Sequence, residues 1–248
     1  MADDLELTFL GCGDAFCSGG RLNTCFHVRA PSCRFLIDCG ATSLLALQRS
    51  GLTSDDIDAI LVTHFHGDHY GGLPFLFLEA ARLRRRQRPL TVVTPQGGPE
   101  RARALLDQLY PSMSSAMDDL DLRFECYRSH QTLDAGPLRV SAYPVIHSEA
   151  ALSHGLRIEV DGRVIGFSGD TRWTDELVPI ADGADLMICE CNFFDTETPV
   201  HLDYRTLERH LPELRAERLI LNHLGDEMLA NLERVEPTCA EDGMRVTF

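Results

Sequence analysis

The feature that most constrains this chain is a short run in which three histidines and one aspartate fall within six residues. The run occupies residues 63–69, with the letters THFHGDH, and it follows directly after the apolar residues 60–62. A strand that ends in a tight loop would direct these side chains into one volume. Neutral imidazole and carboxylate groups together are good ligands for zinc and other first-row metals. The pattern therefore favours a metal site over a chance cluster of surface histidines.

The length and composition are those of a protein with a substantial core. A chain of 248 residues with 44% hydrophobic content can form one large α/β domain or two small ones. No linker or low-complexity run divides it, so we predict a single domain over residues 1–248. No apolar run approaches the ~20 residues that span a bilayer. Residues 1–4 are acidic, unlike a secretory signal, which predicts a cytoplasmic protein.

The charge and the cysteines narrow the function classes. A net charge of −15 repels nucleic acid and anionic membranes unless positive charge gathers locally. Such a cluster exists at Arg82, Arg84, Arg85, Arg86 and Arg88, and the solvated end of a helix explains it better than a binding patch. The chain has no lysine, which excludes Schiff-base chemistry. Nine cysteines without paired C-x₂-C units argue against a disulfide framework or a zinc ribbon.

Further candidate ligands follow predicted strands elsewhere in the chain. His147 follows a strand predicted at residues 138–145, Asp170 follows one at 163–167, and His223 follows one at 219–222. Helices are predicted at residues 42–49, 73–86, 99–109, 175–180 and 204–211. Strand-rich segments with interspersed helices in each half suggest two sheets packed face to face with helices outside. Rigid scaffolds commonly place functional sites at strand ends along one edge.

The ordered set of seven ligands resembles that of the metallo-β-lactamase superfamily of hydrolases, and the resemblance covers nearly the whole chain. It implies a four-layer αββα sandwich and two divalent metal ions, with Zn²⁺ as the default and Mn²⁺ or iron as alternatives. It also implies a role for each ligand. The first metal would be held by His64, His66 and His147, and the second by Asp68, His69 and His223, with Asp170 as the bridge.

Within this superfamily the chain looks most like ribonuclease Z and its relatives. Residues 167–172 read FSGDTR and resemble the ribonuclease Z Ser-Gly-Asp-Thr-Arg motif, and residues 11–24 resemble its glycine-rich loop. A segment at residues 185–192 followed by His201 resembles the part of that family that ends in a second-sphere histidine. The resemblance implies that His201 assists the leaving group, and we expect Asp68 to orient or deprotonate the attacking water. Asp170 stands where zinc β-lactamases carry a cysteine, which disfavours antibiotic hydrolysis. His66 stands where flavodiiron proteins carry a glutamate, which disfavours redox chemistry.

The predicted substrate is a small-molecule or short phosphodiester. Residues 94–145 contain no long Gly/Pro-rich insertion like the tRNA-gripping arm of ribonuclease Z, and this absence together with the negative charge disfavours tRNA. Two alternatives stay open: hydrolysis of a carboxylic ester, thioester or lactone on the same metals, and a non-catalytic metal-binding protein. Because relatives often dimerise, a homodimer is possible, and no membrane partner is expected. The sequence leaves open whether His154, Arg172 or the arginines at 82–88 contact substrate.

Overall fold

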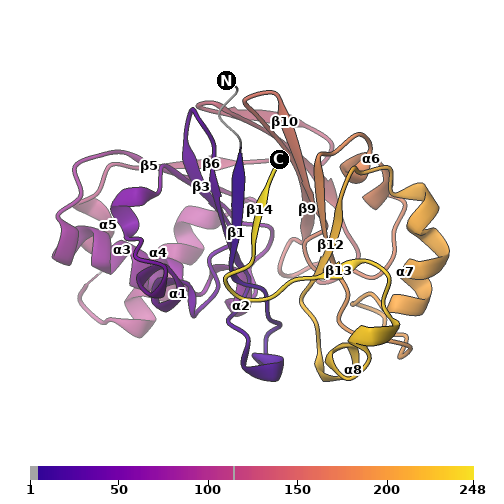
Figure 1. The fold of residues 1–248 in the computed structure, drawn as a ribbon. Helices are drawn as coiled ribbons and strands as arrows, with labels where there is room; N and C mark the ends of the chain where they lie inside the picture. The colour runs from indigo at the N-terminus through magenta and orange to yellow at the C-terminus, as the bar shows by residue number, and fades with distance from the viewer. Residues whose placement is uncertain (1–4, 114) are drawn as a thin grey trace.

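The computed structural model describes residues 5–113 and 115–248. Within these residues the chain forms two sheets of seven strands each, which lie face to face (Figure 1). The first sheet has the order β14 (Arg245–Thr247), β1 (Glu6–Gly11), β2 (Cys25–Arg29), β3 (Arg34–Ile37), β4 (Ala59–Leu61), β5 (Leu90–Thr94) and β6 (Leu122–Cys126). The second has the order β13 (Thr238–Cys239), β12 (Leu219–Asn222), β11 (Leu186–Glu190), β10 (Arg163–Phe167), β9 (His154–Val160), β8 (Leu138–Pro144) and β7 (Thr132–Ala135).

Helices cover the outer face of each sheet, which completes four layers (Figure 1). Beside the first sheet lie α1 (Ser43–Arg49), α3 (Leu73–Leu78), α4 (Gly98–Leu109) and α5 (Ser115–Asp118), and α2 (Gly67–Tyr70) is a single turn at the edge. Beside the second lie α6 (Leu177–Ala181), α7 (Tyr204–His210) and α8 (Asp226–Leu229). Shorter turns are η1 (Ser18–Gly20), η2 (Ser54–Asp56), η3 (Glu79–Arg84), η4 (Leu211–Glu213) and η5 (Leu232–Arg234). The expected αββα sandwich is therefore confirmed.

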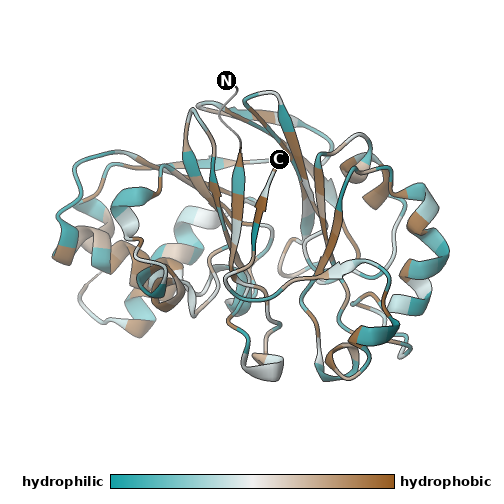
Figure 2. Ribbon diagram, in the orientation of Figure 1, coloured by the Kyte–Doolittle hydropathy of each residue, from teal (hydrophilic) through white to brown (hydrophobic). Residues whose placement is uncertain are grey.

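Alternation along the strands explains why two sheets stack. In β2, Phe26 and Val28 belong to the cluster buried between the sheets, while Cys25 belongs to the cluster under the first layer of helices. Successive side chains of a strand point to opposite faces, so one strand supplies both layers. The Phe26 ring meets the Phe167 ring of the other sheet edge-on, with centroids 5.2 Å apart. In Figure 2, brown bands recur along the strands of both sheets, and teal is frequent on the outer helices.

The strand directions bring several carboxyl ends to one edge of the sandwich. The strands β3 to β6 pair in parallel, and so do β10 to β13. In parallel strands the connecting loops that follow the carboxyl ends gather on one side, which is where open α/β sheets bind ligands. The residues predicted as ligands follow β4, β8, β10 and β12, so the sheet topology places them together.

The helix predicted over residues 73–86 is shorter than expected. It is regular from Leu73 to Leu78 and continues as the wider π-turn η3, which Arg85 ends in a left-handed conformation with φ 54°. Arg86 then turns inward, is 3% exposed, and donates hydrogen bonds to the carbonyls of Ser54 and Ile57. The guanidinium thus supplies a buried donor to carbonyls in and just after η2, and the helical segment ends at Arg84, before this residue.

Two remaining predictions concern the ends and the surroundings of the chain. Residues 1–4, on which the expectation of a protein without a secretory signal rests, lie outside the described residues. Among the helices of the described part, none has the length and apolar character that crossing a bilayer requires.

Candidate metal centre

The seven predicted ligands lie together at the ends of four strands. The loop after β4 and the helical turn α2 supply four of them from the first half of the chain, and the loops after β8, β10 and β12 supply the other three. Their ligand atoms form two groups, and within each group the atoms lie within 4.8 Å of one another. The groups are His64, His66 and His147, and Asp68, His69, Asp170 and His223. The structure thus brings every predicted ligand into one cluster.

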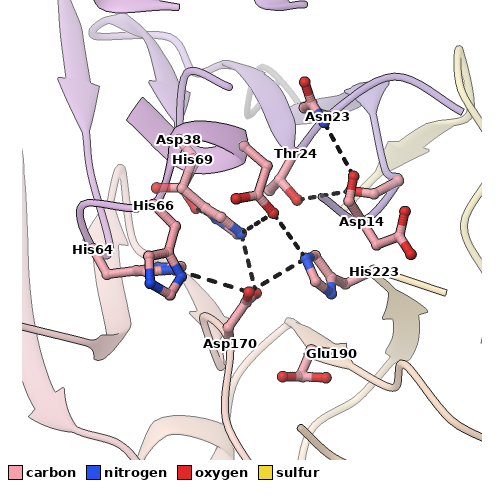
Figure 3. A network of polar contacts seen from close by, with 12 residues as sticks. Asp14, Asn23, Thr24, Asp38, His64, His66, His69, Asp170, Glu190 and His223 are labelled. Carbon is pink, nitrogen blue, oxygen red and sulfur yellow. Dashed lines mark hydrogen bonds and ion pairs between the residues drawn. The ribbon is translucent and has the colours of Figure 1, made fainter. Parts of the chain in front are cut away.

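The carboxylate of Asp170, a member of the second group, also faces His64 of the first group (Figure 3). Its Oδ2 atom is 3.8 Å from Nε2 of His64 and 3.8 Å from Nε2 of His147. The same oxygen is 3.3 Å from Nε2 of His223, and Oδ1 is 3.1 Å from Nε2 of His69. One side chain therefore approaches imidazoles of both groups.

Asp38, which the sequence analysis did not identify, orients His69. Its Oδ2 atom lies 2.6 Å from Nδ1 of His69, and its Oδ1 atom accepts a hydrogen bond from the backbone N–H of Thr63 at 2.8 Å. A ring that donates Nδ1–H to a carboxylate leaves Nε2 free for a metal ion. Asp38 is fully buried and has φ 58°, a left-handed conformation that is costly outside glycine. Its signal in the sequence is an acidic residue directly after the apolar run 35–37.

Backbone contacts orient two further imidazoles. His147 donates from Nδ1 to the carbonyl of Val200 at 2.9 Å, which directs Nε2 into the cluster. The backbone N–H of His223 donates to the carbonyl of Cys12 at 2.9 Å, and the side-chain amide of Asn192 donates to the His223 carbonyl at 3.0 Å. These contacts hold His223 in a left-handed conformation with φ 59°. Strain of this kind persists at functional sites because the surroundings fix it.

The two groups differ in their preferred protonation. Burial lowers the pKa of His147 to about 4 and that of His64 well below its ordinary value, although Asp170 acts in the opposite direction. Burial also disfavours the charged forms of His223 and His69, but the carboxylates of the second group outweigh it. They raise the pKa of His223 to about 9 and that of His69 well above its ordinary value. The first group therefore offers free lone pairs, whereas the second carries protons.

His201 lies beside the cluster and is held by Glu190. Nδ1 of His201 donates to Oε1 of Glu190 at 2.9 Å, and its ring centroid is 4.7 Å from that of His147. Burial opposes the imidazolium of His201, but the fully buried Glu190 outweighs it and raises the pKa of His201. Glu190 also accepts the backbone N–H of Thr171 at 2.6 Å, which ties it to the segment that carries Asp170. The sequence analysis did not single out Glu190, because its neighbours Cys189 and Cys191 have the pattern of packing residues, and both are buried.

The donor set fits divalent metal ions. Nε2 of His64 is buried and makes no hydrogen bond, and Nε2 of His69 and Oδ1 of Asp170 are buried and face each other at 3.1 Å without forming one. Buried polar atoms normally have a hydrogen-bond partner. Where the protein supplies none, a bound ion is a common partner. Imidazole nitrogen together with carboxylate oxygen suits zinc, and also manganese or iron.

Two residues left open by the sequence lie at the margin of this cluster. His154 lines a cavity beside His147, but both of its ring nitrogens are engaged, Nδ1 with the carbonyl of Leu152 at 2.6 Å and Nε2 with Oγ of Ser129 at 3.0 Å. Arg172 is exposed, and its backbone N–H donates to the carbonyl of Ile146 at 3.1 Å, next to the same cavity.

Most of the arginines at 82–88, and the loop residue Asp14, make contacts within the chain that stabilise the fold. Four of the five arginines bind their own chain: Arg82 pairs with Asp119, Arg84 with Glu79 and Arg88 with Asp58, and Arg86 is buried. The carboxylate of Asp14 accepts hydrogen bonds from the backbone N–H groups of Phe16 and Ser18 and from the Ser18 hydroxyl, so turn formation explains it.

The other three histidines have structural surroundings. His27 is buried in β2, and burial lowers its pKa to about 4. His210 stacks on Trp173 with ring centroids 3.9 Å apart. Nε2 of His130 lies 3.4 Å from a carboxylate oxygen of Glu176. None of the three belongs to the cluster of candidate ligands.

Known proteins resemble this chain along almost its full length. The sequence model of the family described as "Anti-Pycsar protein Apyc1" matches residues 5–238. Ribonuclease Z of Methanothermobacter thermautotrophicus is 26% identical, with 89% of this chain and 87% of that protein covered. Anti-Pycsar protein Apyc1 of Bacillus phage BSP38 is also 26% identical, with 92% of each covered.

A solved structure supports the same relationship at the level of the fold. The metallo-β-lactamase fold protein YhfI from Bacillus subtilis superimposes with a TM-score of 0.80 at 21% identity, covering 99% of this chain and 100% of that one. The expected superfamily and its ribonuclease Z-like branch are confirmed by these likenesses. The chain belongs to the family of the anti-Pycsar protein Apyc1, within the metallo-β-lactamase superfamily of metal-dependent hydrolases.

Proposed function

We propose that this protein is a dinuclear metal-dependent phosphodiesterase that acts on a small or short phosphodiester. The observation that carries the proposal is the position of Asp170, whose carboxylate approaches His64 and His147 on one side and His69 and His223 on the other. A structural zinc site binds one metal with four protein ligands, whereas a catalytic site keeps a position open for water. Seven ligands shared by two ions fit the catalytic kind of site.

The metal ions, when bound, supply an activated water at neutral pH and charge stabilisation for the phosphate oxygens. The chain supplies the geometry. Asp38 and the carbonyl of Val200 fix the ring orientations of His69 and His147, so that neither ligand has to reorganise during the reaction. Asp68 accepts from His223 at 3.2 Å and has one further oxygen with which to orient the attacking water.

His201 is the proposed general acid. Because its Nδ1–H is committed to Glu190, its second nitrogen can carry a proton toward the leaving oxygen. The raised pKa of His201 favours the protonated ring at neutral pH, which is the form that a general acid needs. Its side chain is 21% exposed, so it is accessible from the substrate side.

Size and charge favour a small substrate. The cavity beside His147 has a volume of about 500 Å³, which suits a small molecule rather than a folded RNA. The net charge is −15, and the arginines at 82–88 are largely used within the chain, so we infer no extended nucleic-acid surface there. Several relatives are named ribonuclease Z, and RNA is itself a phosphodiester, which supports the bond type.

Turnover of bis(p-nitrophenyl) phosphate by the zinc- or manganese-loaded protein tests the proposal. We expect a kcat/KM for this phosphodiester above those for p-nitrophenyl acetate, a thioester and a lactone measured with the same preparation. A precursor tRNA is the comparison for size, and we expect no cleavage of it.

Asp170→Asn is the matched loss-of-function variant. It keeps the shape of the side chain and removes the negative charge that faces both ligand groups. We expect it to lose both activity and the second equivalent of metal. Faster turnover of the carbonyl esters than of the phosphodiester would reject the proposal, and so would inactivity of the fully loaded protein toward every phosphodiester.

A further inference from the structure

The hydroxyl of Thr63, the residue just before His64, lies between the carboxylate of Asp38 and the ring of His64. Its Oγ1 atom is 2.9 Å from Oδ2 and 3.1 Å from Oδ1 of Asp38, and 3.0 Å from Nδ1 of His64. All three residues are fully buried, so bulk water does not compete for these contacts. The same carboxylate also faces Nδ1 of His69. Asp38 therefore contacts a ligand of the second group directly and a ligand of the first group through one hydroxyl.

The geometry determines the direction of these hydrogen bonds. Both oxygens of Asp38 already accept a donor, Oδ1 from the backbone N–H of Thr63 and Oδ2 from His69, as expected of an ionised carboxylate. The single proton of the Thr63 hydroxyl is donated to Asp38, because the opposite orientation would place oxygen lone pairs against each other at 2.9–3.1 Å. The Thr63 oxygen then faces His64 as an acceptor, so Nδ1 of His64 carries the ring proton.

This tautomer leaves Nε2 of His64 with a free lone pair. An imidazole that binds a metal ion carries one proton, and the nitrogen without the proton is the ligand. Nε2 of His64 is buried, has no hydrogen-bond partner among the described residues, and lies 3.8 Å from Oδ2 of Asp170. A proton on Nε2 would block this atom. The Thr63 hydroxyl therefore selects the form of His64 that can bind a metal ion.

We propose that Thr63 is a positioning residue of the metal centre, and that its hydroxyl extends the action of Asp38 from His69 in the second group to His64 in the first. The inference rests on the metal centre of the proposed function and adds to it a residue that binds neither metal nor substrate. His147, by contrast, is oriented by a backbone carbonyl. His64 and His69 thus depend on one shared carboxylate although they belong to different groups.

Three substitutions test this arrangement. Thr63→Val keeps the branched shape of the side chain and removes the hydroxyl, which leaves the buried Nδ1–H of His64 without its acceptor. We expect the affinity of the first group for zinc to fall about 10- to 100-fold, as is typical when an outer contact of a ligand is removed. The affinity of the second group should change little. Thr63→Ser keeps the hydroxyl and should restore the first group, whereas Asp38→Asn should weaken both groups.

The two affinities are measured separately by calorimetric titration with zinc. His223→Ala leaves only the first group complete, and His147→Ala leaves only the second, so each substitution at Thr63 or Asp38 is made in both backgrounds. An unchanged first group in Thr63→Val overturns the inference. Equal losses in Thr63→Val and Thr63→Ser also overturn it, and so does an Asp38→Asn variant in which only the second group is weakened.

A second measurement uses the wild-type chain and does not depend on the folding of any variant. Nitrogen-15 NMR of the histidine rings in the metal-free protein reports which nitrogen of His64 carries the proton. We expect Nδ1, and a proton on Nε2 would overturn the inference. Failure of the proposed function gives a different result, namely no turnover of bis(p-nitrophenyl) phosphate by the loaded protein while the tautomer of His64 is the one expected.

Discussion

The imidazoles of the second ligand group carry protons that a metal ion has to displace. His69 and His223 face the carboxylates of Asp68 and Asp170 at 3.1–3.4 Å. Without metal, a proton on each ring compensates this negative charge, which is why the pKa of His223 is about 9 despite complete burial. His147 of the first group has a pKa of about 4 and is neutral throughout the physiological range.

Proton release upon metal binding should therefore differ between the two equivalents. At pH 7 we expect the second group to release about one proton from His223, and the first group to release none from His147. Below pH 9 the affinity of the second group should rise about tenfold per pH unit for that proton, and it should level off above pH 9. Calorimetric titration in two buffers with different heats of ionisation measures the released protons. Equal release from both equivalents would contradict this prediction.

The pairing of His201 with Glu190 predicts a dependence on the leaving group. In Glu190→Gln the neutral amide no longer stabilises an imidazolium, so the pKa of His201 should fall and less general acid should be present at neutral pH. We expect kcat to fall about 10²- to 10⁴-fold for a phosphodiester with an alkoxide leaving group. Bis(p-nitrophenyl) phosphate, whose leaving group needs no proton, should lose much less. Unchanged metal content by elemental analysis is the control, and equal losses on both substrates would argue against an acid role.

Close backbone contacts between the loop after β3 and the turn α2 position the second ligand group. Gly40, just after β3, lies against the loop that carries Asp68, and a Cβ atom at Gly40 would be 2.2 Å from the Asp68 carbonyl oxygen and 2.6 Å from Cβ of Asn23. The loop after β3 thus supports the metal cluster on two sides, because it also contributes Asp38.

Gly40→Ala should displace the Asp68 loop. We expect a cost of about 1–3 kcal/mol in the free energy of unfolding, typical of overpacking, and weaker binding of one metal equivalent. The control is Gly67→Ala, within the histidine run itself, where an added Cβ meets nothing within 4 Å. Denaturant unfolding and metal titration of both variants give the comparison. If the two variants behave alike, close packing at Gly40 is not what positions Asp68.

The sequence pattern predicted the elements that have a clear apolar run or helical periodicity of their own. The apolar strands that end at the ligands and the helix over residues 98–109 appear where the pattern indicated. The edge strands β7, β13 and β14 were not predicted, because two to four residues carry little periodicity and only pairing with a neighbour defines them. Asp38 and Glu190 were likewise missed. Asp38 contacts a histidine 31 residues away, and Glu190 contacts one 11 residues away. Only the folded chain reveals these contacts.

Asp242, near the C-terminus, supports the ligand cluster through the N-terminal loop. Asp242 accepts hydrogen bonds from the backbone N–H groups of Cys12 at 3.0 Å and Leu22 at 2.8 Å. The carbonyl of Cys12 in turn accepts the backbone N–H of His223. β14 then pairs with β1 and closes the first sheet. His223 is therefore positioned by contacts with both ends of the chain.

Asp242→Ala should weaken metal binding although Asp242 is not itself a candidate ligand. Loss of its hydrogen bonds should loosen Cys12 and, through it, the His223 backbone. We expect one metal equivalent to bind about 10- to 100-fold more weakly, as is typical when an outer contact of a ligand is removed. Cobalt titration followed by visible absorption resolves the two equivalents. Glu241→Ala, the adjacent exposed residue, is the control, and a similar loss in that variant would show that only general destabilisation is measured.

The separation of its ligands along the chain determines when the centre can assemble in a cell. Asp68 and His223 are 155 residues apart, and at ordinary rates of protein synthesis roughly ten to thirty seconds pass between them. The complete second ligand group cannot exist during this interval. The protonated imidazoles of His69 and His223 meanwhile balance the buried carboxylates in the newly folded protein. Under the proposed function, we therefore expect metal to enter a structure that has already formed, in exchange for these protons.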